Sequence, residues 1–464
     1  MASVSRLGSG ISRYDLFLAG KEIASEDVGI HVERAALNRN LFPFQKEIVL
    51  WALRKGRVAI FCDCGLGKTI MQLAWAEKLG GKVLVLAPLA VGRQTEREGR
   101  KFGIACTYSR TPIDARITIT NYEMLHHFNP RDYVGVVLDE SSILKSFTGK
   151  FRTQLIDTFQ VVPYRLACTA TPAPNDNMEL GNHSEFLGVL SRTEMLSTFF
   201  VHDGGEVQKW RLKRHAEHDF WKWMASWAVM LRRPSDLGYE DGDFVLPELI
   251  FHEEVVPSAP LKGRALVISA RSLDERRTAR LSSLSERVAR VKQIIMERPQ
   301  EPWLVWVNYN AEGDAMDGWK GFVQVSGSDT NEIKEQRMLD FCIQSTTRLV
   351  SKPRICGFGM NFQHCRNIVF LGLSDSYEQF YQAIRRCWRF GQKKKVHCYI
   401  VTSSLEGSVV DNVRRKEADA NKMMEGISKH MNKLNRRAVK GEMFSARPKY
   451  EVETKEAKKK MDHA

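Results

Sequence analysis

The sequence predicts an α/β protein built from two tandem units, each with a parallel sheet flanked by helices. From Leu41 onward, apolar strand-like runs alternate with longer helical patterns. Continuous Val, Ile and Leu runs are typical of strands buried on both faces, as in a parallel sheet. A second series of such runs begins at residue 302, and 464 residues suit about two to three domains.

Each unit is predicted from five apolar runs. The first series is RVAIFC (57–62), KVLVLAP (82–88), ARITITN (115–121), YVGVVLDE (133–140) and YRLACTATP (164–172). The second series is PWLVWVN (302–308), FVQVSG (322–327), RLVSKPRICG (348–357), NIVFLGL (367–373) and KVHCYIVT (395–402). Between them, LDERRTARLSSLSERVARVKQII reads as a helix. We therefore expect an N-terminal extension at 1–40, a first lobe at 41–233, a linker with a helical segment at 234–300, a second lobe at 301–410, and a helix with a basic tail at 411–464.

The composition favours a polyanionic partner. The formal net charge is +14, and such an excess favours nucleic acid over a merely solvated surface. Nine scattered cysteines form no disulfide-like framework, which suits a reducing compartment and buried thiols. No apolar run reaches membrane-spanning length, so we expect a soluble, cytoplasmic protein with no membrane partner.

The segment CDCGLGKT has the pattern of a phosphate-binding loop. It follows a predicted strand and leads into the helical pattern TIMQLAWAEKL. Gly65 and Gly67 allow the tight turn that brings backbone amides to phosphate oxygens, Lys68 reaches the β- and γ-phosphates, and the Thr69 hydroxyl is a magnesium ligand. A plain turn is the alternative, and Cys62 stands where the pattern has glycine. The strand–loop–helix context favours the phosphate site.

Two acidic residues end the apolar strand VVLDE. Asp139 is placed to hold magnesium through water, and Glu140 to orient or deprotonate an attacking water. Paired carboxylates at a strand end are common on ordinary surfaces. Their position after a phosphate-binding loop strengthens the interpretation.

From Leu41 to about Ala420 the chain resembles superfamily-two helicases, specifically the Swi/Snf-like branch of double-stranded DNA translocases. LFPFQ is similar to the adenine-reading Q motif, which implicates Gln45, and GLGKT is the branch's form of motif I, in which the first glycine is commonly absent. APLAVGRQTEREGRKF and ITNYEML resemble motifs Ia and Ib. The resemblance implies two RecA-like lobes (P-loop NTPase), ATP and magnesium as cofactors, and an ATP hydrolase.

Other segments of the first half resemble the family with departures. DESS stands where many members have DExH, so Ser142 replaces the final histidine. TATPAPND is similar to motif III, whose Thr169 and Thr171 would link phosphate state to lobe movement. WAVMLRRPSDLGYEDGDFVLPEL resembles the L-R-R … L-P linker, but lacks the lysine usual after the arginines.

The second half carries the most specific resemblance. GFGMNFQHCRNIVF is similar to motif V, with Gly357, Gly359 and Asn361 aligned and Gly359 implied at the nucleotide. QAIRRCWRFGQ is the Q-A-x-x-R-x-x-R-x-G-Q form of motif VI, which implies a coupling role for Gln382. EGSVVDNVRRKEADAN resembles the brace helices that close the second lobe onto the first.

The two arginines of motif VI have a physical role of their own. Arg386 and Arg389 are three residues apart, so on a helix they face the same way and both meet phosphate oxygens. They would stabilise charge developing on the γ-phosphate from the opposite lobe. Hydrolysis then requires the cleft between the lobes to close.

The expected DNA contacts are strand ends and loop amides that meet one phosphate backbone, with little base reading. The candidates are Pro88, Thr120, Asn121 and Tyr122 on the first lobe, and Asn308, Gly327 and Asn361 on the second. Such binding predicts weak sequence specificity and a steep salt dependence.

The preferred interpretation is a compact ATP-dependent translocase on duplex DNA, of bacterial or phage type, acting in replication, recombination or repair. A strand-separating helicase on DNA, or less readily on RNA, is the rival, although no wedge hairpin is evident. A catalytically silent DNA-binding clamp is the rival from another class. The tryptophan-rich stretch around Trp221, Met224 and Trp227 either stacks on nucleic acid or, as we prefer, packs a core.

Overall fold

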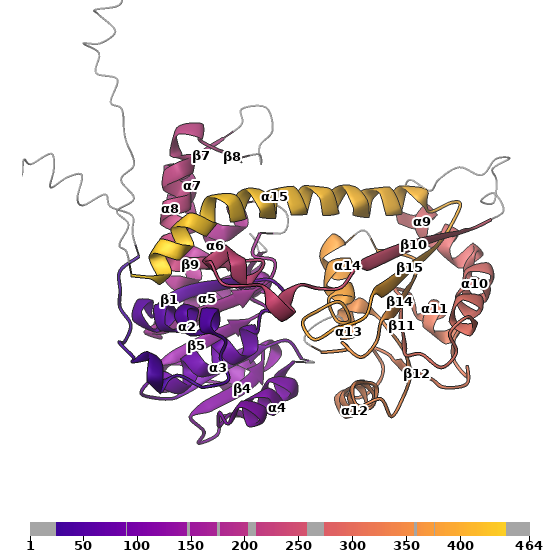
Figure 1. The fold of residues 1–464 in the computed structure, drawn as a ribbon, viewed down its shortest axis with the longest axis horizontal. Helices are drawn as coiled ribbons and strands as arrows, with labels where there is room; N and C mark the ends of the chain where they lie inside the picture. The colour runs from indigo at the N-terminus through magenta and orange to yellow at the C-terminus, as the bar shows by residue number, and fades with distance from the viewer. Residues whose placement is uncertain are drawn as a thin grey trace, which may run out of the picture.

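The protein consists of two α/β units that lie side by side (Figure 1). The computed structural model describes residues 25–89, 91–145, 149–173, 177–202, 210–257, 273–356, 360–374 and 376–441. One long helix, α15 (Gly407–Val439), runs from the second unit across to the first. Most of the expected N-terminal extension and the basic tail from residue 442 lie outside the described residues.

The first unit is a seven-stranded sheet in the order β3-β4-β2-β5-β6-β1-β9, with every pair parallel. Its strands are β1 (Arg57–Cys62), β2 (Val83–Ala87), β3 (Thr107–Tyr108), β4 (Ile117–Asn121), β5 (Gly135–Asp139), β6 (Tyr164–Thr169) and β9 (Ala228–Leu231). Its helices are α2 (Pro43–Lys55), α3 (Lys68–Lys78), α4 (Gly92–Phe102), α5 (Lys150–Phe159), α6 (Leu180–Leu187), α7 (Arg192–Phe199) and α8 (Glu217–Trp227).

The second unit is a six-stranded sheet in the order β10-β15-β14-β11-β13-β12, again parallel throughout. Its strands are β10 (Leu249–Val256), β11 (Trp303–Trp306), β12 (Phe322–Val325), β13 (Arg348–Ser351), β14 (Asn367–Leu371) and β15 (Val396–Ser403). Its helices are α9 (Leu273–Ser282), α10 (Leu284–Met296), α11 (Asn310–Asp314), α12 (Asn331–Cys342), α13 (Pro353–Cys356) and α14 (Tyr377–Ile384).

Both sheets are buried on both faces. In β1, Phe61 packs into one hydrophobic cluster and Ile60 into the cluster on the opposite face. In β11, Trp306 packs into one hydrophobic cluster and Val305 into the cluster on the opposite face. Because successive side chains of a strand point to opposite faces, apolar residues at every position predict this arrangement. The ten predicted strands and the α/β fold class are confirmed.

Three strands of the sheets, β3, β9 and β10, arise where the sequence predicted none. β10 lies in the range expected as linker, yet it pairs along its whole length with β15. Its residues are mostly half-exposed, as suits an edge strand, so no continuous apolar run marks it. β9 pairs with the edge of β1, directly after the tryptophan-rich helix α8.

The tryptophan-rich stretch packs a core. Trp221, Met224 and Trp227 are all buried, and they belong to the same cluster as Phe61. The preferred core interpretation is therefore confirmed.

The segment predicted as one helix at 273–295 is two helices, α9 and α10, separated at Ser283. The Ser283 hydroxyl donates to the Ala279 carbonyl at 2.8 Å, a bond that competes with helix hydrogen bonding. A short antiparallel hairpin, β7 (Phe200–His202) with β8 (Trp210–Leu212), stands away from the first sheet (Figure 1). Among the described helices, none combines the length and apolarity needed to cross a membrane.

Candidate functional site

The predicted phosphate-binding loop connects β1 to α3, as expected. Gly65 and Gly67 have φ angles of 93° and 80°, a left-handed region that only glycine enters without strain. A Cβ atom on Gly65 would lie 2.9 Å from the Phe390 backbone nitrogen. The loop therefore lies directly against the second unit, and glycine is required there for two reasons.

Lys68 begins α3 and remains charged. Its amine donates to the carbonyl oxygens of Cys62 at 2.8 Å and Asp63 at 3.4 Å. Burial opposes the charge, but Cys64 and Glu140 raise the pKa of Lys68 above its usual value. A cation held at the mouth of this loop is suited to phosphate oxygens.

Asp139 and Glu140 lie at the end of β5, beside the phosphate-binding loop. The Asp139 carboxylate accepts a hydrogen bond from the Gln72 side chain of α3 at 2.8 Å. Burial, together with the neighbouring Glu140 charge, raises the pKa of Asp139 to about 6. Hard oxygen donors whose charges repel one another fit a divalent cation, and Thr69 in the first turn of α3 supplies a hydroxyl of the same kind.

Glu140 has a φ of 55°, a left-handed conformation that costs a non-glycine residue free energy. Its carboxylate accepts a hydrogen bond from the Thr169 hydroxyl at 3.3 Å, and the same hydroxyl accepts from the Thr171 backbone amide at 3.1 Å. The ends of β5 and β6 are therefore connected through Thr169. Strain at such a position is typical of functional sites.

A histidine reaches the same strand end from a distant helix. His183 of α6 is buried, and its Nε2 lies 3.1 Å from the Ser141 hydroxyl. Burial lowers the pKa of His183 to about 4, so the ring is neutral. The sequence drew attention to Ser142 as a missing histidine, but no local signal pointed to His183.

The second unit contacts the phosphate-binding loop through α14 and the turn after it. The Tyr381 hydroxyl donates to the Asp63 carboxylate at 2.6 Å, and Arg385 pairs with the same carboxylate at 3.2 Å. Arg385 also donates to the Cys64 carbonyl. Arg385 occupies a variable position of the motif, so the sequence did not single it out.

We expect the change Arg385→Gln to open the cleft between the units. It removes buried hydrogen bonds to a charged group, each worth about 1.5–3 kcal/mol, which is enough to shift a closed–open equilibrium about tenfold. Small-angle scattering should show a larger radius of gyration for the variant. Arg277→Gln, at an exposed arginine of α9 in the same unit, is the control, and identical profiles for all three proteins would contradict the expectation.

Arg386 and Arg389 differ in how they are held. Arg386 is buried and donates to the Gln382 carbonyl at 3.0 Å, the Gln382 side chain at 2.8 Å and the Met360 carbonyl at 3.3 Å. Arg389 makes one weak bond to Met360 at 3.5 Å, and its buried Nε has no hydrogen-bond partner within the described residues.

The electrostatic surroundings of Arg389 include both units. Burial and the Arg386 charge lower the pKa of Arg389 to about 10, while Cys64 and Glu98 of the first unit oppose that shift. An under-satisfied guanidinium whose charge interacts with Cys64 of the phosphate-binding loop is available to a phosphate ligand.

Gln45 lies against the phosphate-binding loop. Its side-chain amide donates to the Leu66 carbonyl at 2.9 Å and its oxygen accepts from the Phe42 amide at 2.9 Å. Aromatic rings from both units surround this point, with Phe244 and Phe390 centroids 4.6 Å apart. A cavity of about 620 Å³ beside the loop is lined by Phe244 and Phe390 together with Asp63, Arg385 and Trp388.

The expected DNA contacts of the first unit are mostly buried side chains. Thr120, Asn121 and Tyr122 are each less than 5% exposed. The Asn121 amide donates to the Pro88 carbonyl at 3.3 Å, and the Tyr122 hydroxyl donates to the Asp139 carbonyl at 2.7 Å. Only their backbone atoms are suitable for a phosphate contact, while the side chains shape the loops.

A second cavity between the units, of about 580 Å³, is lined by candidate residues of the first lobe and by other residues of the second. Pro88, Tyr122 and Glu140 line it from the first unit, and Lys334 and Arg354 from the second. Three other candidates lie elsewhere on the second unit, with Asn308 and Asn361 half-buried and Gly327 exposed. Gly357 and Gly359 lie outside the described residues.

Comparisons with known proteins find a matching family model and several relatives. Residues 286–391 match the family model "Helicase conserved C-terminal domain". The chain is 22% identical over 422 residues to the SWI/SNF-related matrix-associated actin-dependent regulator of chromatin subfamily A-like protein 1 of Drosophila melanogaster, covering 82% of this chain and 55% of that protein. It is 28% identical over 159 residues to the DNA annealing helicase and endonuclease ZRANB3 of Mus musculus, covering 30% of this chain and 15% of the relative.

A third relative and a solved structure complete the comparison. Helicase SWR1 of Yarrowia lipolytica is 30% identical over 159 residues, covering 29% of this chain and 9% of the relative. The solved structure of the Sulfolobus solfataricus SWI2/SNF2 ATPase core in complex with dsDNA matches with a TM-score of 0.41 and 16% identity, covering 88% of this chain and 99% of that one. The chain spans about half the length of the Drosophila relative and much less of the other two.

Proposed function

We propose that this chain is a motor that moves along duplex DNA. The chain is a Swi/Snf-like helicase of superfamily two, and it is an ATP hydrolase by family. The observation that carries the proposal is the contact between Asp63 and the pair Tyr381 and Arg385. It brings the phosphate-binding loop of one unit against the arginine-rich turn of the other. A nucleotide bound there would interact with both units, so its hydrolysis state would change their separation.

The residues divide the chemistry between the two units. On the first, Lys68 and the loop amides hold the triphosphate, and Glu140 orients the attacking water. Thr69 and Asp139 would hold magnesium, which neutralises phosphate charge when bound. On the second, Arg389 stabilises the charge that develops on the γ-phosphate, while Gln382 keeps Arg386 in place. Thr169 links Glu140 to the next strand end, which suits a coupling role.

Duplex DNA is the proposed track. The net charge of +14 supplies the electrostatic attraction, and contacts through backbone atoms at Pro88, Asn121 and Asn308 would read no bases. The Drosophila and Mus musculus relatives bear names from chromatin regulation and DNA annealing. A role in replication, recombination or repair, in a bacterial or phage-infected cytoplasm, is part of this proposal.

Strand separation is the second candidate function. The observation that favours it is the β7–β8 hairpin, which the sequence did not predict and which stands away from the first sheet. His202 and Trp210 pack edge to face between its two strands at 5.2 Å. A forked duplex distinguishes the two functions, because only a strand-separating enzyme would release a labelled strand from it.

We expect steady-state ATPase activity to rise with duplex DNA well above its rise with single-stranded DNA or RNA. The stimulation should fall steeply with salt, because DNA binding weakens. Each neutralised phosphate contributes about −0.9 to the slope of the logarithm of the binding constant against the logarithm of the salt concentration. ATP turnover measured from 50 to 200 mM salt checks this. Preference for single strands would support the strand-separating helicase, and no turnover on any nucleic acid would support a silent clamp.

A further inference from the structure

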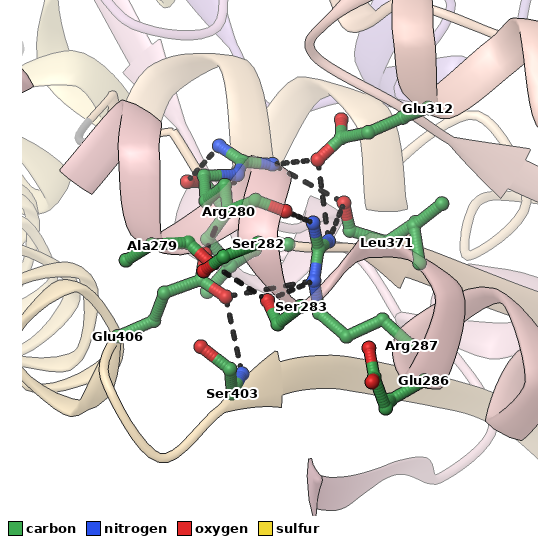
Figure 2. Close-up of polar contacts among 12 residues, drawn as sticks. Ala279, Arg280, Ser282, Ser283, Glu286, Arg287, Glu312, Leu371, Ser403 and Glu406 are labelled. Carbon is green, nitrogen blue, oxygen red and sulfur yellow. Dashed lines mark hydrogen bonds and ion pairs between the residues drawn. The ribbon is translucent and has the colours of Figure 1, made fainter. Parts of the chain in front are cut away.

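Four charged side chains form a buried cluster in the second unit, shown in Figure 2. Arg280, Arg287, Glu312 and Glu406 are between 0% and 5% exposed. The two positive and two negative charges balance. Taking four charges out of water is costly, and apolar residues of similar volume are often as stabilising. The cluster is therefore better explained by the geometry that it imposes than by stability.

Glu312 connects the arginines to the loop that follows β11. One of its oxygens accepts from Arg280 at 2.9 Å and from Arg287 at 3.2 Å. The other accepts from the backbone amides of Asn308 at 2.8 Å and Tyr309 at 3.1 Å. The Arg280 guanidinium also lies over the Tyr309 ring, 4.8 Å from its centroid. The conformation of this loop thus depends on both arginines.

Glu406 connects the same two arginines to the start of α15. Its carboxylate lies 3.3 Å from the Nε of Arg280 and 3.7 Å from the Nε of Arg287. At its other end, α15 is attached to the first unit, where Asn435 donates to the Met230 carbonyl at 2.9 Å. The helix crosses from one unit to the other in Figure 1. The arginines thus stand between the bridging helix and the loop.

We propose that this buried cluster is a positioning device that links α15 to the loop at Asn308 and Tyr309. When the units move, α15 changes its angle, and Glu406 moves with it. Neither arginine can leave its carboxylates without exposing an unpaired buried charge, so the loop follows the helix. The consequence for DNA rests on the proposed function, but the link between helix and loop does not.

The change Glu406→Gln tests the link while keeping the size of the side chain. Amide hydrogen exchange is measured on peptides that cover 308–312. We expect exchange there to be about tenfold faster than in the unchanged protein, because the loop loses its indirect support.

Glu301→Gln is the matched control. Glu301 pairs with Arg366 and accepts from Asn367 at the amino end of β11, the opposite end from the loop. Its loss weakens the same unit without touching the cluster. Unchanged exchange at 308–312 in Glu406→Gln, or an equal increase in Glu301→Gln, would overturn the proposal.

A second variant guards against misfolding. Glu406→Asp keeps the charge but shortens the side chain, so the carboxylate no longer reaches both arginines, and the same loss of protection is expected. Failure of both variants to loosen the loop would also overturn the proposal.

The functional readout is the number of base pairs moved per ATP hydrolysed. It is obtained by dividing the rate of movement, measured by triplex displacement, by the ATPase rate. We expect this ratio to fall at least about threefold in Glu406→Gln, while the ATPase rate without DNA stays unchanged. A loss of stability alone would not change the number of base pairs moved per ATP. An unchanged ratio would refute the consequence for DNA. An unchanged protein that never displaces a triplex would refute the proposed function, and the exchange measurement would still decide the link.

Discussion

Arg389→Ala is expected to lower DNA-stimulated ATP turnover by about 10³–10⁵-fold, the range typical of an arginine that stabilises the transferring phosphoryl group. Within the described residues, Arg389 makes only one weak bond inside its own unit, and its buried Nε has no hydrogen-bond partner. Its removal therefore costs little stability. ATP binding, measured by displacement of a fluorescent analogue, should change far less than turnover, because the loss concerns the transition state.

The matched comparison is Arg386→Ala. Arg386 makes three bonds to Gln382 and Met360 and is buried, so its removal should lower both turnover and the melting temperature. Turnover of Arg389→Ala within about tenfold of the unchanged protein would show that Arg389 does not meet the phosphate. An equal loss of melting temperature in both variants would remove the proposed division of roles.

Glu140→Gln is expected to reduce turnover by about 10²–10⁴-fold, the usual contribution of a general base. The amide keeps the shape of the side chain but cannot accept a proton. The variant should keep its fold. Because the Glu140 charge adds to the effect of burial in raising the pKa of Asp139, loss of that charge should make Asp139 easier to ionise. Single-turnover hydrolysis of radiolabelled ATP measures the loss directly, and the melting temperature checks the fold.

Glu123→Gln is the control for this variant. Glu123 is exposed and lines the same cavity between the units as Glu140. If both variants lose turnover equally, the effect reflects the charge of the cavity. If Glu140→Gln retains nearly full turnover, another group activates the water.

Local pattern was enough to predict the ten strands and the phosphate-binding loop. Continuous apolar runs such as RVAIFC and NIVFLGL encode burial on both faces, which occurs in a parallel sheet. Gly65 and Gly67 encode left-handed backbone, and the structure has them in that region. The edge strand β10 was missed because one of its faces is partly open to solvent and its residues are mixed.

The contacts between distant segments could not be predicted in this way. Arg385 and Asp63 are far apart in the chain, and neither has a neighbour that indicates the other. His183 reaches Ser141 only because α6 packs beside β6. The roles of the individual site residues remain predictions, which the variants above are designed to test.

The sequence by itself determined the two parallel sheets, the loop between β1 and α3, and the acidic pair at the end of β5, because each depends on residues adjacent in the chain. Only the tertiary structure decided which arginine meets Asp63, which residues hold Glu140, and that four buried charges connect α15 to the loop at Asn308. Hydrogen bonds and ion pairs form between side chains that folding brings within about 4 Å. A linear pattern carries no record of that proximity.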